Sequence, residues 1–277
     1  MSTSRRKFLK LSALAGGSVG LGLLSSSRSL SVPPSPAPKP LKILILGGTG
    51  FTGPFQVKYA VSRGHQVSVF NRGRTHPGIL PKEVEQLIGD RNGQLDALKG
   101  RKWDVVIDVP TTIPVWVRDV AQILKGNVDR YVFVSTLSVY SDNSKPGMDE
   151  SGPLAKYEGA DAMKETQQSL RASNMMLYAP LKVESEREAE KWFPGKTLIV
   201  RPGLIVGPGD ESDRFTYWPV RVARGGEVLA PGDPKKDTVQ FIDARDLAEW
   251  IIRMFVPSIV ISIVAMQAES LRECGRT

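Results

Sequence analysis

Tyr178 and Lys182 have the residue types and the spacing that acid–base chemistry requires. Because they are four residues apart, their side chains lie on one face if the segment is helical. Pro180 cannot occupy a helix interior, so we expect the helix to begin near Tyr178 with Pro180 in its first turn. A lysine ammonium and a helix N-terminus both favour a phenolate, so we expect the pKa of Tyr178 to be lowered from about 10. Such a tyrosine can exchange a proton with a substrate hydroxyl while a nicotinamide exchanges hydride.

A glycine-rich turn, GGTGFTG, follows an apolar run and precedes a segment with helical spacing. Glycines let a pyrophosphate approach the backbone closely, and the N-terminus of the next helix supplies positive partial charge. The strand–turn–helix context therefore predicts a dinucleotide site. The residues of the turn that we expect at the cofactor are Gly47, Thr49, Gly50, Phe51, Thr52 and Gly53.

The end of the second predicted strand distinguishes NAD from NADP. An acid about 20 residues after the glycine turn bonds the ribose 2′-hydroxyl of NAD, whereas an arginine there can hold the 2′-phosphate of NADP. This chain has Asn71 and Arg72 at that point, then Arg74, and no acid. We therefore prefer NADP to NAD, with Arg72 as the phosphate partner and Arg74 as second choice; the alternative for either arginine is a solvated loop charge. Asp90, after the third strand, is placed to meet the adenine.

Apolar segments alternate with helical ones along the body of the chain. Strands are expected at residues 41–46, 66–70, 84–88, 104–109, 131–135 and 197–200, and helices at 51–63, 95–98, 113–124, 160–170 and 179–192. This alternation predicts a doubly wound parallel sheet of the α/β class, an NAD(P)-binding Rossmann fold. We expect it to span residues 41–200, followed by a small, incomplete C-terminal substrate lobe over 201–277.

Four motifs resemble those of the extended or atypical short-chain dehydrogenase/reductases, of the NAD-dependent epimerase/dehydratase type. They are GGTGFTG (47–53), VSTLSVYS (134–141), YAPLK (178–182) and RPGLIVGPGD (201–210). The resemblance covers roughly residues 41–254. It implies that Tyr178 and Lys182 act on a substrate hydroxyl or carbonyl beside the nicotinamide, and that Lys182 also contacts the cofactor.

The resemblance also assigns a hydroxyl upstream and a loop downstream of this pair. Counting back from Tyr140 identifies Thr136 as the hydroxyl that bonds the same substrate oxygen, with Ser135 as the out-of-register alternative. Pro202 begins the loop that leads to the nicotinamide and the substrate lobe.

Two segments depart from the family pattern. Residues 141–177 are longer than the family requires, which indicates an insertion that could cap or block the site. After Met254 the pattern stops in an apolar run, 255–265, which is too short to span a bilayer. Arg214 and Tyr217 are candidate substrate contacts, with a structural role as the alternative for each.

The chain of 277 residues has a net charge of +8, and most of this charge lies at its N-terminus. Residues 1–40 hold six basic residues and no acid, so the remainder carries only +2. A nearly neutral body argues against nucleic acid as a partner. One cysteine excludes an internal disulfide, and two histidines argue against a metal site.

The N-terminal segment is typical of an export signal. Arg5 and Arg6, followed by Lys-Phe-Leu-Lys, resemble a twin-arginine (Tat) signal, and the alternative is a disordered basic tail. The apolar run at 11–24 is shorter than the ~20 residues of a membrane span. Residues 33–40 are rich in proline, and we expect them to form an extended spacer. The sequence leaves open whether the signal is cleaved.

The sequence therefore predicts an exported NAD(P)-dependent oxidoreductase of the epimerase/dehydratase type. Its expected partners are a small sugar-like or hydroxyl-bearing substrate and, during export, the Tat translocase. The alternative is a non-catalytic member of the same Rossmann family that binds nucleotides or RNA, because a fold alone does not fix a function.

Overall fold

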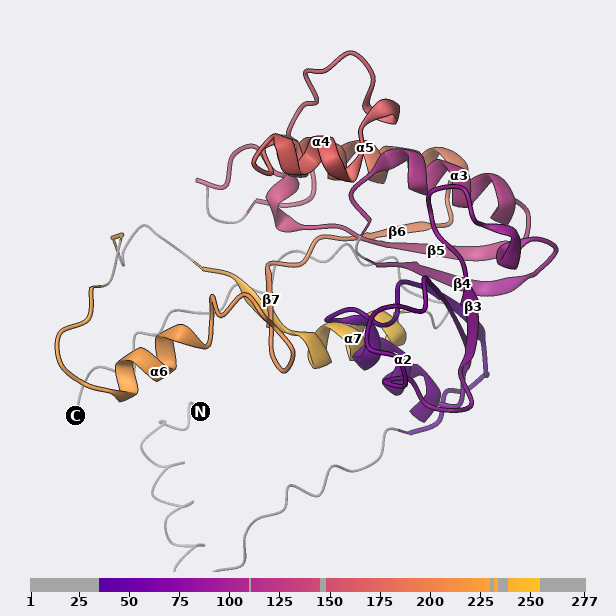
Figure 1. The fold of residues 1–277 in the computed structure, drawn as a ribbon, viewed down its shortest axis with the longest axis horizontal. Coiled ribbons are helices and arrows are strands. Elements are labelled where there is room, and N and C mark those ends of the chain that lie inside the picture. Colours follow the sequence, from indigo (N-terminus) through magenta and orange to yellow (C-terminus); the bar gives the residue numbers. More distant parts are fainter. Residues whose placement is uncertain (1–34, 110, 145–147, 230–231, 234–238, 255–277) are drawn as a thin grey trace, which may run out of the picture. The chain divides into compact units, whose positions relative to one another are not determined.

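A parallel sheet of six strands, in the order β3-β2-β1-β4-β5-β6, forms the centre of the computed structural model (Figure 1). The structure describes residues 35–109, 111–144, 148–229, 232–233 and 239–254. The predicted export signal and the apolar run after Met254 lie outside the described residues. The strands are β1 (Lys42–Leu46), β2 (Gln66–Asn71), β3 (Glu85–Ile88), β4 (Trp103–Asp108), β5 (Val128–Val134) and β6 (Thr197–Val200).

Helices cover both faces of this sheet, as the doubly wound prediction requires (Figure 1). The described helices are α2 (Gly53–Ser62), α3 (Pro114–Leu124), α4 (Gln167–Ala172), α5 (Tyr178–Trp192), α6 (Tyr217–Ala223) and α7 (Ala244–Arg253). Of these, α6 lies apart from the large sheet (Figure 1). In β1, Ile43 and Ile45 pack in the cluster that includes α2 and α7, whereas Leu44 and Leu46 pack in the cluster that includes α3. Alternate side chains of a strand point to opposite faces, so one buried strand serves both layers.

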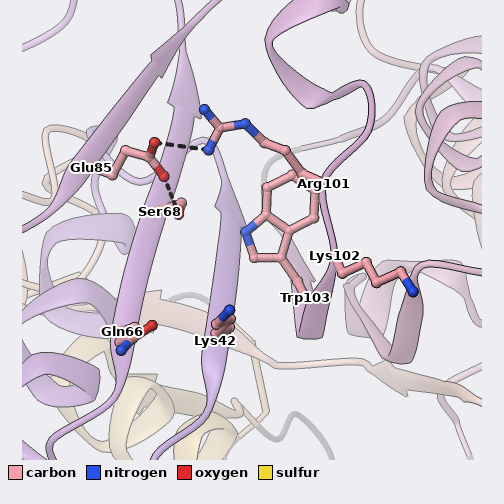
Figure 2. Close-up of a pocket in the computed structure, with 7 residues that line it drawn as sticks. All are labelled: Lys42, Gln66, Ser68, Glu85, Arg101, Lys102 and Trp103. Atoms are coloured by element: carbon pink, nitrogen blue, oxygen red, sulfur yellow. Dashed lines mark hydrogen bonds and ion pairs between the residues drawn. The ribbon is translucent and has the colours of Figure 1, made fainter.

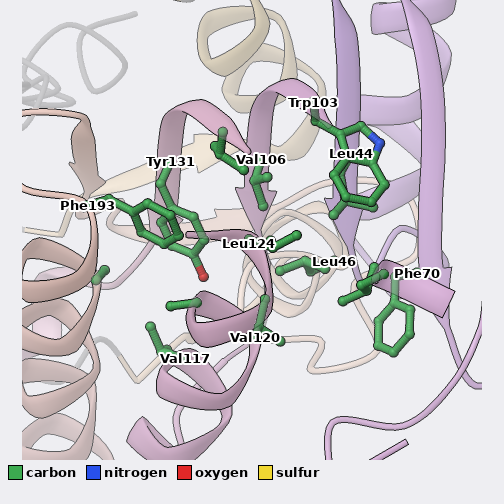
Figure 3. Close-up of a cluster of buried hydrophobic side chains, with 14 of the residues drawn as sticks. Leu44, Leu46, Phe70, Trp103, Val106, Val117, Val120, Leu124, Tyr131 and Phe193 are labelled. Atoms are coloured by element: carbon green, nitrogen blue, oxygen red, sulfur yellow. The ribbon is translucent and has the colours of Figure 1, made fainter. Parts of the chain in front are cut away.

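The second of these clusters is drawn in Figure 3. Val117, Val120 and Leu124 of α3 pack there on the sheet. The rings of Tyr131 and Phe193 are stacked, with centroids 4.5 Å apart. The same cluster includes Leu46 and Phe133, so the core reaches the ends of β1 and β5 at the edge that carries the predicted site.

The predicted helix at 160–170 is wrong, because the structure divides this segment. A short 3-10 helix (Ala162–Lys164) is followed by α4, which begins after Thr166. Thr166 is extended, and its hydroxyl accepts a hydrogen bond from the Ser169 amide at 3.1 Å, while the Ser169 hydroxyl accepts one from the Thr166 amide at 2.8 Å. This reciprocal cap starts a new helix and interrupts the earlier one.

Beyond β6 the chain forms a second, smaller sheet that the sequence did not predict. Strands β7 (Leu204–Val206) and β8 (Phe241–Asp243) pair in parallel, with α6 between them in sequence. Asp243 caps α7 by accepting a hydrogen bond from the Arg245 amide at 2.8 Å. Among the described helices, none is both long and apolar enough to cross a membrane.

Candidate active site

The predicted cofactor residues lie where the parallel strands end, at the carboxyl edge of the large sheet. The glycine turn follows β1, Asn71 ends β2, Asp90 lies just beyond β3, and Pro202 lies just beyond β6. The strand order reverses between β1 and β4, and open α/β sheets bind ligands at this point. The structure therefore gathers residues from across the sequence at the edge where a dinucleotide would bind.

The geometry of the glycine turn fits a closely approaching ligand. A Cβ atom at Gly53 would collide with the backbone of Gly48, so only glycine fits between the turn and α2. At Gly50, by contrast, a Cβ atom would have no protein atom within 4 Å. The turn is thus tight on its protein side and open on the other, as a pyrophosphate at the N-terminus of α2 requires.

The end of β2 supplies a second feature that fits the cofactor. Asn71 Oδ1 accepts a hydrogen bond from the Gly73 amide at 2.6 Å, while its Nδ2 is buried and has no partner in the described chain. A buried polar atom without a partner is costly, so Asn71 Nδ2 is a ready donor to a ligand. Arg72 and Arg74 are exposed in the following loop, and neither forms an ion pair with a described residue.

Asp90 and Pro202 border the same edge from its two sides. The Asp90 carboxylate accepts hydrogen bonds from the backbone and side-chain nitrogens of Asn92, both at 2.9 Å. Pro202 is buried, and its carbonyl accepts a hydrogen bond from the Leu137 amide at 2.8 Å. Contact of either residue with a cofactor remains a prediction.

The predicted catalytic residues meet at the N-terminus of α5, which begins at Tyr178 as expected. The Thr136 hydroxyl lies close enough to the Tyr178 phenol to lower its pKa. Thr136 caps a short 3-10 helix (Leu137–Val139) after β5, and its hydroxyl accepts a hydrogen bond from the Ser138 amide at 3.2 Å. The alternative, Ser135, is buried, and its hydroxyl has no partner among the described residues. The influence of Thr136 on Tyr178 favours Thr136 over Ser135.

Lys182 lies one turn further along α5 and is buried. Its ammonium donates a hydrogen bond to the Val134 carbonyl at 2.8 Å and lies 4.9 Å from the centroid of the Phe133 ring. Burial lowers the pKa of Lys182 to about 8, although the negative charges of Asp108 and Glu186 oppose this effect. Lys182 is therefore anchored to β5, with two of its three ammonium protons left for other acceptors.

The predicted lowering of the Tyr178 pKa is wrong. Burial raises the pKa of Tyr178 above its usual value and outweighs the hydrogen bond with Thr136 and the positive charge of Arg214, which both lower it. Lys182, with a pKa of about 8, is already neutral at the higher pH where Tyr178 titrates and therefore does not lower this pKa. Desolvation of the phenolate therefore dominates, and the phenol keeps its proton at neutral pH.

Residues of the predicted insertion at 141–177 pack beside Tyr178. One apolar cluster joins side chains of the insertion, of α3 and its N-cap, and of α5; it includes Ile113, Trp116, Tyr157, Leu170, Leu177, Tyr178 and Leu181. Tyr178 remains only partly buried. The insertion therefore covers one side of Tyr178 without closing it off.

Sequence reasoning missed the buried polar network beneath this edge. The Asp108 carboxylate, at the end of β4, accepts hydrogen bonds from Arg91, Thr111 and Tyr131. The signal available in the sequence was an acid at the end of an apolar strand and an arginine next to Asp90. Thr111 is near Asp108 in sequence, but Arg91 and Tyr131 are far from it, so no local pattern reveals the network.

A shallow polar pocket of about 310 Å³ lies at the opposite edge of the sheet (Figure 2). It is lined by the first residues of β1, β2, β3 and β4, which are Lys42, Gln66, Glu85 and Trp103. Its Glu85 carboxylate is bound by Arg101 and by Ser68, each at 2.8 Å. The pocket contains none of the predicted site residues. Within the described chain, no group of three or more His, Cys, Asp or Glu side chains could hold a metal ion.

Comparison with known proteins relates this geometry to two curated relatives. The chain is 27% identical over 194 residues to "Chloroplast stem-loop binding protein of 41 kDa b, chloroplastic" of Arabidopsis thaliana, covering 61% of this chain and 50% of the relative. It is 29% identical over 238 residues to 2-alkyl-3-oxoalkanoate reductase of Stenotrophomonas maltophilia (strain K279a), covering 76% and 64% respectively. The chain thus spans between half and two thirds of the length of these relatives.

A solved structure and a family model agree with the fold. The structure of the Bordetella bronchiseptica enzyme WbmG in complex with NAD superposes with a TM-score of 0.61 at 15% identity, over 83% of this chain and 74% of that one. The model of the NAD dependent epimerase/dehydratase family matches residues 43–257, which include the glycine turn, the hydroxyl segment after β5 and the Tyr-Lys pair. The chain therefore belongs to the NAD dependent epimerase/dehydratase family.

Proposed function

We propose that this chain is a nicotinamide-dependent oxidoreductase or epimerase that acts on a hydroxyl or carbonyl group of a small, sugar-like or hydroxyl-bearing molecule. The observation that carries the proposal is the position of Tyr178 at the N-terminus of α5, near the Thr136 hydroxyl and one helical turn from the buried ammonium of Lys182. These groups lie at the sheet edge that also holds the glycine turn. Family membership supports the proposal, because the family is defined by dinucleotide-dependent chemistry.

Each of the three side chains has a distinct role in this proposal. A bound dinucleotide would supply or accept the hydride. Tyr178, protonated at neutral pH, donates its proton to a substrate oxygen that gains negative charge, which is the reductive direction. Thr136 orients that oxygen by a hydrogen bond, and the charge of Lys182 stabilises the phenolate left behind.

For the cofactor we propose NADP in preference to NAD. The loop after β2 supports this choice, since it offers Arg72 and the buried donor of Asn71 but no acid for a ribose 2′-hydroxyl. Arg74, two residues further on, is the second candidate for the phosphate.

A native mass spectrum of the purified protein, followed by a spectrophotometric assay, tests the proposal. We expect a retained mass of NADP or NAD, and oxidation of the reduced cofactor by carbonyl compounds that include sugar-like ketones and 3-oxo acids. The 3-oxo acids are included because one relative is named as a reductase of 2-alkyl-3-oxoalkanoates. A folded protein that neither retains nor binds either dinucleotide contradicts the proposal.

We also propose that the protein is exported by the Tat route. The twin arginines and the short apolar run support it, as does the logic of a route that carries folded proteins with their cofactors. Export would place the site outside the cytoplasm, where little free dinucleotide is supplied, so a tightly held cofactor is part of the proposal.

RNA binding is a second candidate, favoured by one observation. A relative that covers 61% of this chain is named for binding stem-loops. The charge of only +2 beyond residue 40 and the assembled Tyr178–Lys182 pair favour the enzyme. An electrophoretic assay with a stem-loop RNA at rising salt, on the full chain and on a chain without residues 1–40, tests this candidate. Binding that is lost without residues 1–40 belongs to the basic segment and not to the body that carries the Tyr178–Lys182 pair.

A further inference from the structure

The carboxylate of Asp108 is the centre of a buried polar network. It is fully buried and accepts hydrogen bonds from Arg91 Nη1 at 3.1 Å, Arg91 Nη2 at 2.5 Å, Thr111 Oγ1 at 2.5 Å and Tyr131 Oη at 2.5 Å. A carboxylate offers about four acceptor positions, so these four bonds saturate it. Asp108 therefore does not bind a substrate or a dinucleotide itself, and a buried ion pair alone is weak evidence for a role in stability.

Arg91 carries this network across the point where the strand order reverses. Its Nη2 also contacts the Leu46 carbonyl at 3.4 Å, and Leu46 pairs with Asp108 in the register of β1 and β4. Leu46 directly precedes the glycine turn, and Arg91 directly follows Asp90. The network thus ties the start of the predicted phosphate loop to the end of β4.

Lys182 lies on the other side of Asp108. Asp108 pairs with Phe133 in the register of β4 and β5, and the Lys182 ammonium lies over the Phe133 ring. The charged groups of the described chain that act on this ammonium are Asp108 and Glu186, which favour its charged form, and Arg91, which opposes it. Glu186 is itself bound by Arg201 at 2.7 and 3.1 Å.

We propose that Asp108 is a positioning residue of the catalytic site: fixed by Arg91, its buried carboxylate stabilises the ammonium of Lys182. The catalytic meaning of this coupling rests on the proposed function, in which Lys182 must be charged to assist Tyr178. The two charges act on Lys182 in opposite directions, since Asp108 attracts the ammonium and Arg91 repels it.

Two charge-removing substitutions with opposite expected effects test the proposal. The titration of Lys182 is followed by NMR of the full chain labelled at the lysine ε-carbon, without added dinucleotide, and its signal is assigned with Lys182→Gln. In Asp108→Asn we expect the midpoint to fall by about one pH unit or more, because an attracting charge is lost. In Arg91→Gln we expect it to rise, because a repelling charge is lost.

A purely structural role would not produce opposite shifts. Glu188→Gln is the matched control: Glu188 is a buried acid of the same helix, bound by Lys191 at 2.8 Å and Trp192 at 2.9 Å, and it is not among the groups that act on Lys182. We expect this variant to leave the midpoint unchanged. Shifts of Asp108→Asn and Arg91→Gln in the same direction, or no shift in either, overturn the proposal.

A double variant keeps the test decisive if a single substitution prevents folding. Asp108→Asn combined with Arg91→Gln removes both charges of the pair, so no buried charge is left without its partner. Because Asp108 acts on Lys182 more strongly than Arg91 does, the midpoint should still fall, by less than in Asp108→Asn alone. A midpoint at or above that of the unaltered protein overturns the proposal.

The titration is independent of catalysis, so the two hypotheses can fail separately. Opposite shifts in a protein that binds no dinucleotide would reject the proposed function and support the coupling of Asp108 to Lys182. Dinucleotide-dependent turnover without the shifts would support the proposed function and reject the coupling.

Discussion

The Thr136 hydroxyl lies close enough to the Tyr178 phenol to lower its pKa, although the two residues belong to segments separated by a long insertion. Tyr178 is the first residue of α5, and Thr136 follows the end of β5. This proximity therefore depends on how α5 packs against the sheet. In the proposed mechanism, this arrangement brings the proton donor and the orienting hydroxyl to one point.

Removal of the Tyr178 hydroxyl should abolish most of the turnover. We expect Tyr178→Phe to lower kcat by about 10²- to 10⁴-fold, the usual contribution of a positioned acid, and to leave the dissociation constant of the dinucleotide nearly unchanged. Steady-state kinetics and a fluorescence titration measure the two. Tyr157→Phe is the control, because the Tyr157 hydroxyl donates to Glu165 within the insertion. Full turnover by Tyr178→Phe would remove Tyr178 from the mechanism.

Loss of the Arg72 side chain should weaken the binding of NADP and leave the binding of NAD unchanged. A charge-assisted hydrogen bond to a 2′-phosphate contributes about ten- to a hundredfold in affinity, and NAD lacks that phosphate. Isothermal titration of Arg72→Ala with each cofactor measures the difference. Arg74→Ala is the matched control, with a smaller expected effect; equal losses for NADP and NAD in Arg72→Ala contradict the assignment.

Two alanine substitutions in the glycine turn should have different consequences. Gly50→Ala is expected to leave the free energy of unfolding nearly unchanged, since its Cβ atom meets no protein atom within 4 Å, and to weaken dinucleotide binding by about tenfold or more. Gly53→Ala places a Cβ atom against the backbone of Gly48 and should lower the free energy of unfolding by about 1–3 kcal/mol. Thermal unfolding and cofactor titration separate the two. Unweakened binding in Gly50→Ala would exclude this turn as the phosphate loop.

The rate should fall as the pH rises above about 8. Burial lowers the pKa of Lys182 to about 8, so the ammonium that assists Tyr178 loses its proton as the pH passes through that value. The pH profile of kcat/KM, which reports the free enzyme, should therefore show a descending limb near pH 8. A rate that stays constant to about pH 10 would show that the charge of Lys182 is not needed.

The export proposal is tested on the twin arginines alone. Replacement of both Arg5 and Arg6 by lysine preserves the charge but removes the signal that the translocase recognises. We expect the full chain to accumulate in the cytoplasm, as measured by cell fractionation and immunoblotting. Arg28→Lys, outside the motif, should not change the export, and normal export of the double variant would contradict the Tat assignment.

Local patterns of the sequence were sufficient for much of the fold. The six strands, the glycine turn and the start of α5 at Tyr178 follow from short-range rules, namely apolar runs, glycine spacing and the position of Pro180. The division of the segment at 160–170 was missed because a Thr166–Ser169 cap competes with helical spacing. Strands β7 and β8 have three residues each, too few for a recognisable alternation.

The sequence by itself determined the chemical types at the site and their order along the chain, because residue identity and helical spacing are local properties. Only the tertiary structure decided the state of those groups. Burial raised the pKa of Tyr178, whereas the neighbouring lysine predicted the opposite. The packing of the strands also brought Asp108 into hydrogen-bond contact with Arg91 and Tyr131. Desolvation and long-range hydrogen bonds depend on which strands and helices pack together, and a single sequence does not contain that information in any local pattern.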